Sequence, residues 1–306
     1  MSGCSNSRAM RLFDAHCHLQ DRRIAAVCPQ LIRASIDSGV LRFAVNGVSE
    51  KDWHLVKQMG EQYPCVVPNF GLHPWYVTER TANWFNMLRE FLTATPTAAV
   101  GEIGLDKGSH GRNIEFSQQV EVFRQQLELA KELQRPASVH CVRAFGDLLE
   151  ILQNVGPFPA GLILHSYLGS AEMVPGFAKL GAYFSFSGYL TSMKSTKAKN
   201  MLKLVPKDRI LVESDAPDGL PNLTESLLVV PLDDSSPQGL QSQHGDPLCE
   251  ASVSPKEELN HPANIHTVLN YVATMLQMPN EELAELTYRN ATRLFSYNGL
   301  EVVEEG

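Results

Sequence analysis

The chain alternates short apolar segments with longer segments in which apolar residues recur every three or four positions. The short segments have the length of buried strands, and the longer ones have the period of helices that bury one face. One long stripe of apolar residues is formed by Phe116, Val120, Phe123, Leu127, Ala130 and Leu133. This alternation predicts an α/β protein.

The pattern contains eight predicted strands with helices between and after them. The predicted strands are 11–16, 42–48, 65–71, 98–104, 137–141, 161–165, 182–187 and 209–215. The predicted helices are 23–38, 50–63, 80–94, 116–133, 144–155, 171–180, 195–205, 262–276 and 280–295. Strands that alternate with helices predict a parallel sheet, and eight of them predict a closed (β/α)8 TIM barrel. A doubly wound open sheet is the alternative.

One segment, 220–259, interrupts this rhythm because it is rich in Pro, Ser, Gln, Gly and Asp and has little periodicity. We expect it to be a long loop insertion, partly disordered, within a single barrel domain that spans 1–306. Its position after the eighth strand places it at the mouth of the barrel. A tolerated surface insertion is the favoured interpretation, ahead of a substrate lid.

Composition narrows the class of protein. The 306 residues are 43% hydrophobic, enough for one large core or two modest ones, and carry a formal net charge of −8. An acidic chain does not resemble a passive nucleic-acid coat, although bound dications would reverse the local charge at an active site. The six cysteines show no CxxC spacing, and no apolar stretch approaches a membrane span. We expect a soluble, monomeric, intracellular protein, cytoplasmic or nuclear, without membrane association.

Polar residues able to bind metals stand at the ends of several predicted strands. His16 and His18 end the first strand, and because side chains alternate along a strand they point the same way. The carboxyl ends of the strands of a TIM barrel meet at one face, where its active sites lie. Four more such residues belong to this face, namely Glu102, His140, His165 and Asp215. Each alone has a structural explanation, such as an ion pair, but together they indicate a site.

Four imidazoles and two carboxylates exceed the needs of one tetrahedral ion and suit two divalent cations that share a carboxylate and a water. Glu102 is the natural bridge. Such a water readily loses a proton and attacks an electrophilic phosphorus or carbonyl carbon, and Asp215 could accept the proton. Mg²⁺, Mn²⁺ and Zn²⁺ all remain candidates. The predicted sets are His16, His18, Glu102 and Asp215 for one cation, and Glu102, His140 and His165 for the other.

Nine short segments resemble the TatD-type deoxyribonuclease family of the metal-dependent hydrolase, or amidohydrolase, superfamily. They are DAHCHL at 14–19, GLHP at 71–74, GEIGLD at 101–106, VHC at 139–141, HSYLGS at 165–170, FSFSG at 184–188, ESDAP at 213–217, NHPAN at 260–264 and NATRLF at 290–295. The resemblance covers 11–296 apart from the insertion. It implies a barrel, two divalent cations and metal-dependent DNA hydrolysis, typically as a 3′→5′ exonuclease, and an active-site role for His73.

The chain also departs from the family pattern in ways that bear on the substrate. Arg143 lies one position beyond the usual phosphate-binding arginine, Tyr167 replaces a phenylalanine, and His261 replaces a glutamate. Arg143 and His261 are therefore uncertain substrate contacts. Lys194, after the seventh strand, could steer a phosphate backbone, or it could simply begin a solvated helix. Tyr76, like the neighbouring tryptophan, could stack on a base or pack in the core.

Three functions follow from these observations. The first is a deoxyribonuclease that acts on single-stranded DNA. The second is a hydrolase of another ester or amide bond, such as a D-aminoacyl-tRNA deacylase with tRNA as its partner. The acidic chain and the displaced Arg143 add weight to this alternative. The third, a non-enzymatic binding barrel, is disfavoured because a decayed site would have lost ligands.

Overall fold

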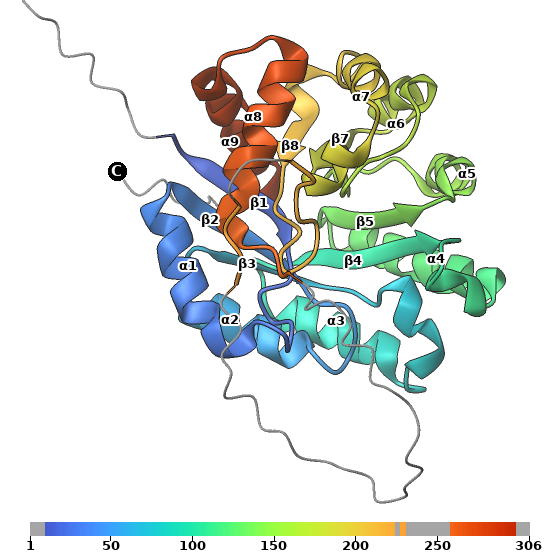
Figure 1. Cartoon of the computed structure of the whole chain (residues 1–306). Coiled ribbons are helices and arrows are strands. Elements are labelled where there is room, and N and C mark those ends of the chain that lie inside the picture. The colour runs from blue at the N-terminus through green and yellow to red at the C-terminus, as the bar shows by residue number, and fades with distance from the viewer. Residues whose placement is uncertain (1–9, 224–226, 231–257, 298–306) are drawn as a thin grey trace, which may run out of the picture.

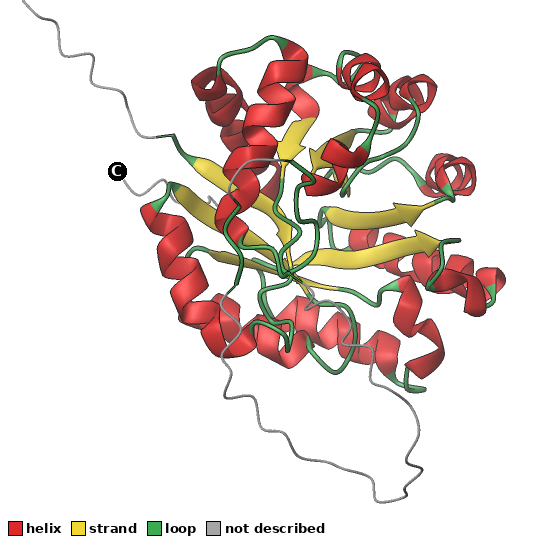
Figure 2. Cartoon of the chain, viewed as in Figure 1, coloured by secondary structure: helices red, strands yellow, loops and turns green. Residues whose placement is uncertain are grey.

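Eight parallel strands form the centre of the molecule and helices surround them (Figure 1, Figure 2). The computed structural model describes residues 10–223, 227–230 and 258–297. The strands follow one another around the sheet in sequence order. They are β1 (Leu12–Cys17), β2 (Val40–Asn46), β3 (Val66–Phe70), β4 (Ala99–Asp106), β5 (Ala137–Val142), β6 (Leu162–Leu164), β7 (Ala182–Phe186) and β8 (Ile210–Val212).

The two edges of the sheet meet where the chain leaves β1 and β8. The backbone N–H of Asp215 donates to the carbonyl of His16 at 3.0 Å, and that of His18 donates to the carbonyl of Ala216 at 2.7 Å. Every β-strand in the described residues is thus part of a nearly closed (β/α)8 barrel, and the predicted TIM-barrel fold is confirmed.

The helices occupy the outside of the barrel and one end of it. They are α1 (Cys28–Asp37), α2 (Trp53–Gln62), α3 (Trp84–Ala94), α4 (Phe116–Glu132), α5 (Phe145–Val155), α6 (Val174–Lys179), α7 (Ser195–Leu202), α8 (Ile265–Leu276) and α9 (Asn280–Phe295). Five of them, α1, α2, α3, α6 and α8, begin three to five residues later than predicted. Ala25–Val27 forms a 3₁₀ turn before α1, and Pro74–Glu79 forms another ahead of α3. No helix in the described ranges is long and apolar enough to cross a membrane.

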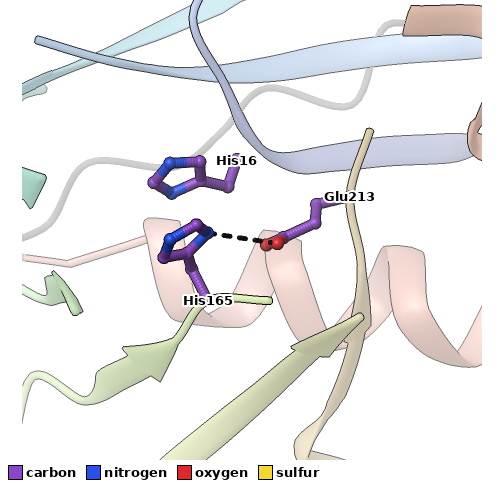
Figure 3. A group of neighbouring side chains, drawn as sticks. All are labelled: His16, His165 and Glu213. Atoms are coloured by element: carbon purple, nitrogen blue, oxygen red, sulfur yellow. Dashed lines mark hydrogen bonds and ion pairs between the residues drawn. The ribbon is translucent and has the colours of Figure 1, made fainter. Parts of the chain in front are cut away.

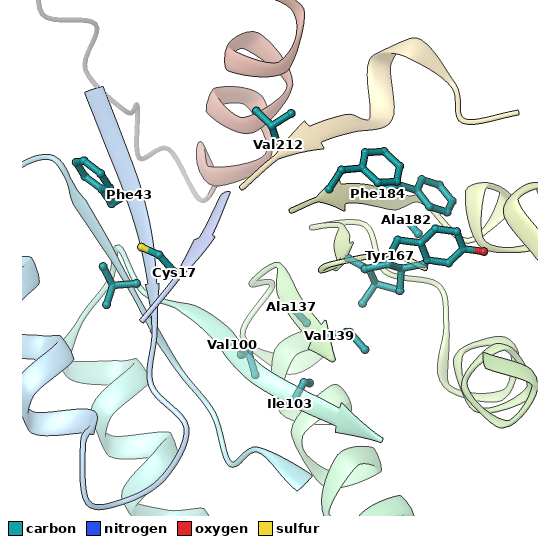
Figure 4. Close-up of a cluster of buried hydrophobic side chains, with 14 of the residues drawn as sticks. Cys17, Phe43, Val100, Ile103, Ala137, Val139, Tyr167, Ala182, Phe184 and Val212 are labelled. Carbon is teal, nitrogen blue, oxygen red and sulfur yellow. The ribbon is translucent and has the colours of Figure 1, made fainter. Parts of the chain in front are cut away.

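The main core lies between the strands and the outer helices. In α4 the predicted stripe places Phe123, Leu127 and Ala130 against the barrel, where all three are buried. The strands contribute their outward side chains to this layer (Figure 4). Those labelled there include Phe43, Val100, Ile103, Ala137, Val139, Ala182, Phe184 and Val212. Burial of such side chains supplies the main driving force for closing the barrel.

A second, smaller cluster combines alternate strand residues with α9. Ala44, Val67 and Ile163 belong to it, whereas their neighbours along each strand pack in the main core. The ring of Phe295, at the end of α9, stacks on that of Phe13 with 5.1 Å between centroids. Because these residues lie toward the starts of the strands, α9 covers the amino end of the barrel. The carboxyl end is left for polar residues.

Most of the predicted insertion, 224–226 and 231–257, lies outside the described residues. In the part described, Val229 forms an antiparallel bridge with Asn260, and the N–H of Val230 donates to the carbonyl of Leu259 at 3.1 Å. The chain therefore leaves and returns at nearly the same place. That the insertion is a loop, and that 1–306 is a single domain, stay predictions.

Candidate metal centre

The carboxyl end of the barrel gathers the six residues predicted as metal ligands. They come from β1, β4 and β5 and from the segments that follow β1, β6 and β8. All lie deep, and His18, the most exposed of them, has only 13% of its side-chain surface accessible. A buried set of imidazoles and carboxylates is costly unless a cation or a complete hydrogen-bond network compensates it.

The first set forms around one oxygen of Glu102. Its Oε2 lies 3.5 Å from Nε2 of His16 and 3.3 Å from Nε2 of His18. These two nitrogen atoms are 3.2 Å apart. Oδ1 of Asp215 completes the set at 3.9 Å from Nε2 of His16 and 3.7 Å from Nε2 of His18.

The second set forms around the other oxygen of the same carboxylate. Oε1 of Glu102 lies 3.0 Å from Nδ1 of His140 and 3.0 Å from Nε2 of His165. The two nitrogen atoms are 3.3 Å apart. Nε2 of His73 approaches the same oxygen at 3.4 Å. Glu102 therefore stands between both sets, as the bridging prediction requires.

These spacings suit metal coordination. Two ligand atoms about 2.1 Å from one ion, at right to tetrahedral angles, lie about 3.0–3.4 Å apart. The contacts of Glu102 with His18, His140 and His165 fall in this range, and those of Asp215 are slightly longer. The donor atoms are imidazole nitrogen and carboxylate oxygen, which zinc and manganese accept readily. The residues present therefore fit two divalent cations.

The ring nitrogen atoms that face away from Glu102 are also engaged. Nδ1 of His18 donates to the carbonyl of Asn46, which holds its Nε2 as an electron-pair donor. Such outer contacts fix the tautomer and orientation of metal-binding histidines. The three other outer partners are Oγ of Ser138 for His16 at 2.9 Å, Oδ2 of Asp106 for His140 at 3.3 Å and Oε1 of Glu213 for His165 at 3.3 Å.

Glu213 has this outer position although it precedes the ligand Asp215 by only two residues. Figure 3 shows its carboxylate directed at His165, whose ring lies over that of His16. The two rings stack with 3.9 Å between centroids. Oε1 of Glu213 also accepts from the N–H and the hydroxyl of Ser166, at 2.7 and 2.8 Å. Glu213 therefore positions His165 and its ring.

The electrostatics of the centre favour positive charge. Burial alone would raise the pKa of Glu102, but the imidazoles around it hold that pKa well below its usual range. Burial lowers the pKa of His18, yet its contact with Glu102 outweighs this and raises the pKa to about 9. The pKa values of His140 and His165 are also raised against burial, by Asp106 and Glu102 for His140 and by Glu102 and Glu213 for His165. The carboxylate of Glu102 thus favours a positive charge on the neighbouring imidazoles, and a metal cation at the same place would be favoured for the same reason.

Two imidazoles of the centre, those of His16 and His73, stay neutral. Burial lowers the pKa of His16 to about 3 and that of His73 to about 4. Burial also raises the pKa of Asp215 to about 7. Perturbed values of this kind are common at functional sites.

Glycines permit the close approach of the strands beneath the centre. A Cβ on Gly101, just before Glu102, would lie 2.8 Å from Oδ1 of Asn46 and 2.8 Å from Cβ of Ser138. Gly104 has a φ of +149°, and a Cβ there would lie 2.0 Å from the carbonyl oxygen of His140. The two glycines of the GEIGLD segment thus allow β4 to present its carboxylates at this depth.

The four predicted substrate contacts are placed less centrally. Arg143 and Lys194 are exposed, and no ion pair joins either side chain to the described residues. Tyr76 is half-buried, with its ring centroid 6.3 Å from that of His73. His261 is buried, and its Nδ1 accepts from the N–H of Ala263 at 3.0 Å. None has a hydrogen bond to the six-residue set among the described contacts, so their roles stay predictions.

Sequence reasoning missed two of the residues that contact the outer nitrogen atoms of the histidines, Asp106 and Ser138. Asp106 accepts from Nε1 of Trp75 at 2.5 Å as well as contacting His140. A signal was present, because 102, 104 and 106 share one face of a strand and Ser138 likewise shares a face with His140. Alternation alone would therefore have selected Asp106 and Ser138 as candidates.

Comparison with known proteins identifies the family. The family model described as TatD related DNase matches residues 13–296, nearly the whole chain. The chain belongs to this family. It is a metal-dependent hydrolase of the TatD family, with buried clusters of His, Glu and Asp suited to metal ions.

Relatives of the TatD family cover almost the same length. An uncharacterized metal-dependent hydrolase of Bacillus subtilis, YabD, is 29% identical over 287 residues, 94% of this chain and 100% of that protein. The 3′-5′ ssDNA/RNA exonuclease TatD of Pantoea vagans is 26% identical, covering 93% and 99%. The crystal structure of YJJV, a TatD homolog from Escherichia coli, has a TM-score of 0.77 at 23% identity, covering 94% and 99%, which supports the fold.

Proposed function

We propose that the protein is a divalent-metal-dependent deoxyribonuclease that shortens single-stranded DNA from its 3′ end. The observation that carries this proposal is the single buried carboxylate, Glu102, whose two oxygens each face a separate set of imidazole nitrogen atoms. Two cations held in this way suit in-line hydrolysis of a phosphodiester. The exonuclease names of TatD relatives support the choice of bond and substrate.

Each side chain of the centre has a proposed role. His16, His18, Glu102 and Asp215 would hold one cation, and Glu102, His140 and His165 the other. When bound, two divalent cations would polarise the scissile phosphate and acidify the attacking water.

Asp215 is the proposed proton acceptor. Its Oδ1 lies 3.9 Å from Nε2 of His16 and 3.7 Å from Nε2 of His18, so the carboxylate belongs to the first set and could take up the proton of an attacking water there.

His73 is the proposed hydrogen-bond donor to the substrate. Its Nδ1 accepts from the N–H of Trp75 at 3.2 Å, so in the neutral ring Nε2 carries the hydrogen. Burial, which lowers its pKa to about 4, keeps the ring neutral. From its position beside Glu102, Nε2 could donate to a phosphate oxygen or to the leaving oxygen.

The rim of the centre offers contacts for a flexible strand. Trp75 is 37% exposed, and its ring lies 4.6 Å from that of His110 and 4.8 Å from that of His73, between centroids. A base could stack on this exposed indole. The exposed cations Arg143 and Lys194 are the proposed contacts for backbone phosphates, with Tyr76 and His261 as further candidates.

A second candidate is hydrolysis of the ester bond of a D-aminoacyl-tRNA. It is favoured by Arg143, which is exposed and has no described contact with the centre, so phosphate binding beside the cations lacks a fixed arginine. The same pair of cations could polarise an ester carbonyl.

The decisive test compares both substrates with wild-type protein and with Glu102→Gln. Single-stranded DNA should shorten from its 3′ end with Mg²⁺, Mn²⁺ or Zn²⁺ and stay intact with EDTA. Glu102→Gln should lower turnover by more than about a hundredfold, because even outer partners of metal ligands contribute about 10–100-fold. Glu150→Gln, on the exposed side of α5, is the matched control.

Each other outcome is informative. Turnover of the tRNA ester alone would select the second candidate. Full activity of Glu102→Gln would contradict the bridging role, and no turnover of either substrate with any metal would contradict both functions.

A further inference from the structure

A separate cavity of about 660 Å³ lies at the amino end of the barrel. It is lined by the segments that lead into β6, β7 and β8 and by the end of α9. The metal centre lies at the carboxyl ends of the same strands, so the barrel separates the two. The size is that of a pocket for a small organic molecule. Nothing in the proposed hydrolysis uses it.

The cavity is cationic. Lys179, Arg209 and Arg293 line it, and its lining contains no acidic side chain. Both guanidinium groups lie over the ring of Tyr183, with Cζ 4.7 Å from the centroid for Arg209 and 6.0 Å for Arg293. This ring is itself buried, so it holds the two cations at fixed positions.

The arginines are only partly neutralised. Asp208, outside the lining, lies 3.6 Å from Nε of Arg209 and 3.9 Å from Nη2 of Arg293. Nη2 of Arg293 also donates to the carbonyl of Asp208 at 2.6 Å and to Oδ1 of Asn290 at 3.3 Å. Asp208 thus contacts two of the three cations, and the hydrogen bonds and the ion pair described for Arg293 all use Nη2. Nη1 of Arg209 donates to the carbonyl of Gly181 at 3.0 Å. The other nitrogen atoms of Arg293 remain available to a ligand.

Aromatic and apolar side chains complete the lining. Phe158 precedes β6, and Tyr297 follows α9 with its hydroxyl donating to the carbonyl of Thr97 at 2.7 Å. A fixed phenol and a phenyl ring beside three cations match a ligand with an anionic end and a planar or apolar body.

We infer that this cavity binds a small organic phosphate of the nucleotide class, independently of the metal centre. The phosphate would be held by Arg293, Arg209 and Lys179, since guanidinium groups bind phosphate oxygens in pairs. The base or other ring would lie along the apolar part of the lining, where Pro157 and Pro159 are exposed beside the buried rings of Phe158 and Tyr297. A phosphate dianion balances the excess of two positive charges, which a neutral nucleoside does not.

The test is calorimetric titration of the full-length protein in EDTA, which prevents phosphate binding to metal ions. The probes are inorganic phosphate, thymidine 5′-monophosphate and thymidine. We expect the nucleotide to bind most tightly, phosphate more weakly and thymidine at least about tenfold more weakly than the nucleotide, as expected for loss of charge-assisted hydrogen bonds.

Two variants of α9 locate the site. Arg293→Gln should weaken nucleotide binding by at least about tenfold, the loss expected for one charge-assisted contact. Arg289→Gln, one turn earlier and paired with Glu285 outside the cavity, should bind as wild type does. Should Arg293→Gln fail to fold, Lys179→Gln replaces it, and this variant should likewise bind the nucleotide more weakly than wild type.

Three outcomes would overturn the inference. They are no binding of the nucleotide to wild-type protein, equal binding by Arg293→Gln and Arg289→Gln, and thymidine binding as tightly as its phosphate. None of these measurements involves hydrolysis, so the nuclease proposal and this one fail or succeed separately.

Discussion

At the scale of single residues, the imidazoles of the centre have a hydrogen-bond partner on the ring nitrogen that faces away from Glu102. The outer nitrogen atoms of His140 and His165 face the carboxylates of Asp106 and Glu213, and that of His18 faces a backbone carbonyl. A carboxylate behind an imidazole makes the opposite nitrogen a stronger electron-pair donor. His140 and His165, candidate ligands of the second set, are therefore oriented and made more basic by these contacts.

Replacement of Asp106 by Asn tests this outer contact. Asp106 accepts from Trp75 and faces His140, and these contacts overcome its burial and lower its pKa to about 2. The variant Asp106→Asn should keep the fold but weaken metal-dependent turnover by about 10–100-fold, mainly as a higher metal requirement. Metal titration of activity measures this. Asp147→Asn, which removes only the surface partner of Lys107, should match wild type; equal metal requirements in both variants would contradict the role.

The metal-ligand candidates could be selected from the sequence because each stands within a buried strand or within three residues after one. Their outer partners depend on register between strands, such as the pairing of Gly104 with His140, which places Asp106 beyond the histidine. The register of two strands depends on contacts between them, and these contacts cannot be read from the sequence of either strand alone. The position of Arg143 was equally beyond prediction, because its φ of +55° is set where β5 leaves the sheet.

At the scale of elements, strand and helix order was predictable since each buried strand and each amphipathic helix repeats one simple pattern. The residues at which the helices start were less predictable. The segment after the GLHP turn continues as a 3₁₀ helix, Pro74–Glu79, where Nδ1 of His73 accepts from the N–H of Trp75. The side chain of His73, which lies beside Glu102, thus also caps the 3₁₀ helix that follows it. At the predicted start of α3, the N–H of Thr81 donates to Oε2 of Glu50 at 2.9 Å and its hydroxyl accepts from the N–H of Asn83 at 3.3 Å, so the helix begins only at Trp84.

Substitution of Gly104 tests whether β4 requires a residue without a Cβ at this position. An added Cβ would meet the carbonyl of His140, in a φ region that other residues rarely adopt. Gly104→Ala should lower the free energy of unfolding by about 2–4 kcal/mol and reduce activity, because strain and overpacking add. Gly146→Ala, on α5 with no atom within 4 Å of the new Cβ, should instead raise it by about 0.5 kcal/mol. Urea denaturation measures both; equal effects would refute the packing argument.

At the scale of the whole molecule, the candidate ligands join parts of the barrel that are far apart in the sequence. His16 and Asp215 lie on either side of the closure between β1 and β8, and Glu102 reaches them from β4. Arg23 adds a surface link across the same closure, with two contacts to Asp218 at 2.7 and 2.8 Å. Cations bound at this point would hold the two edges of the sheet together and so favour the folded chain.

Metal binding should therefore raise thermal stability, and more so at higher pH. A ligand that binds only the folded state at about 100 times its dissociation constant adds about 2.7 kcal/mol. Without metal, His18 keeps a proton up to pH of about 9, and the pKa values of His140 and His165 are also raised. Because a cation must displace these protons, its apparent affinity rises with pH.

The increase in melting temperature on adding Mn²⁺, measured against EDTA, should be larger at about pH 8 than at about pH 6. Glu102→Gln should lose most of this increase at both pH values. An increase independent of pH, or one that Glu102→Gln retains, would place the stabilising cations elsewhere on the molecule.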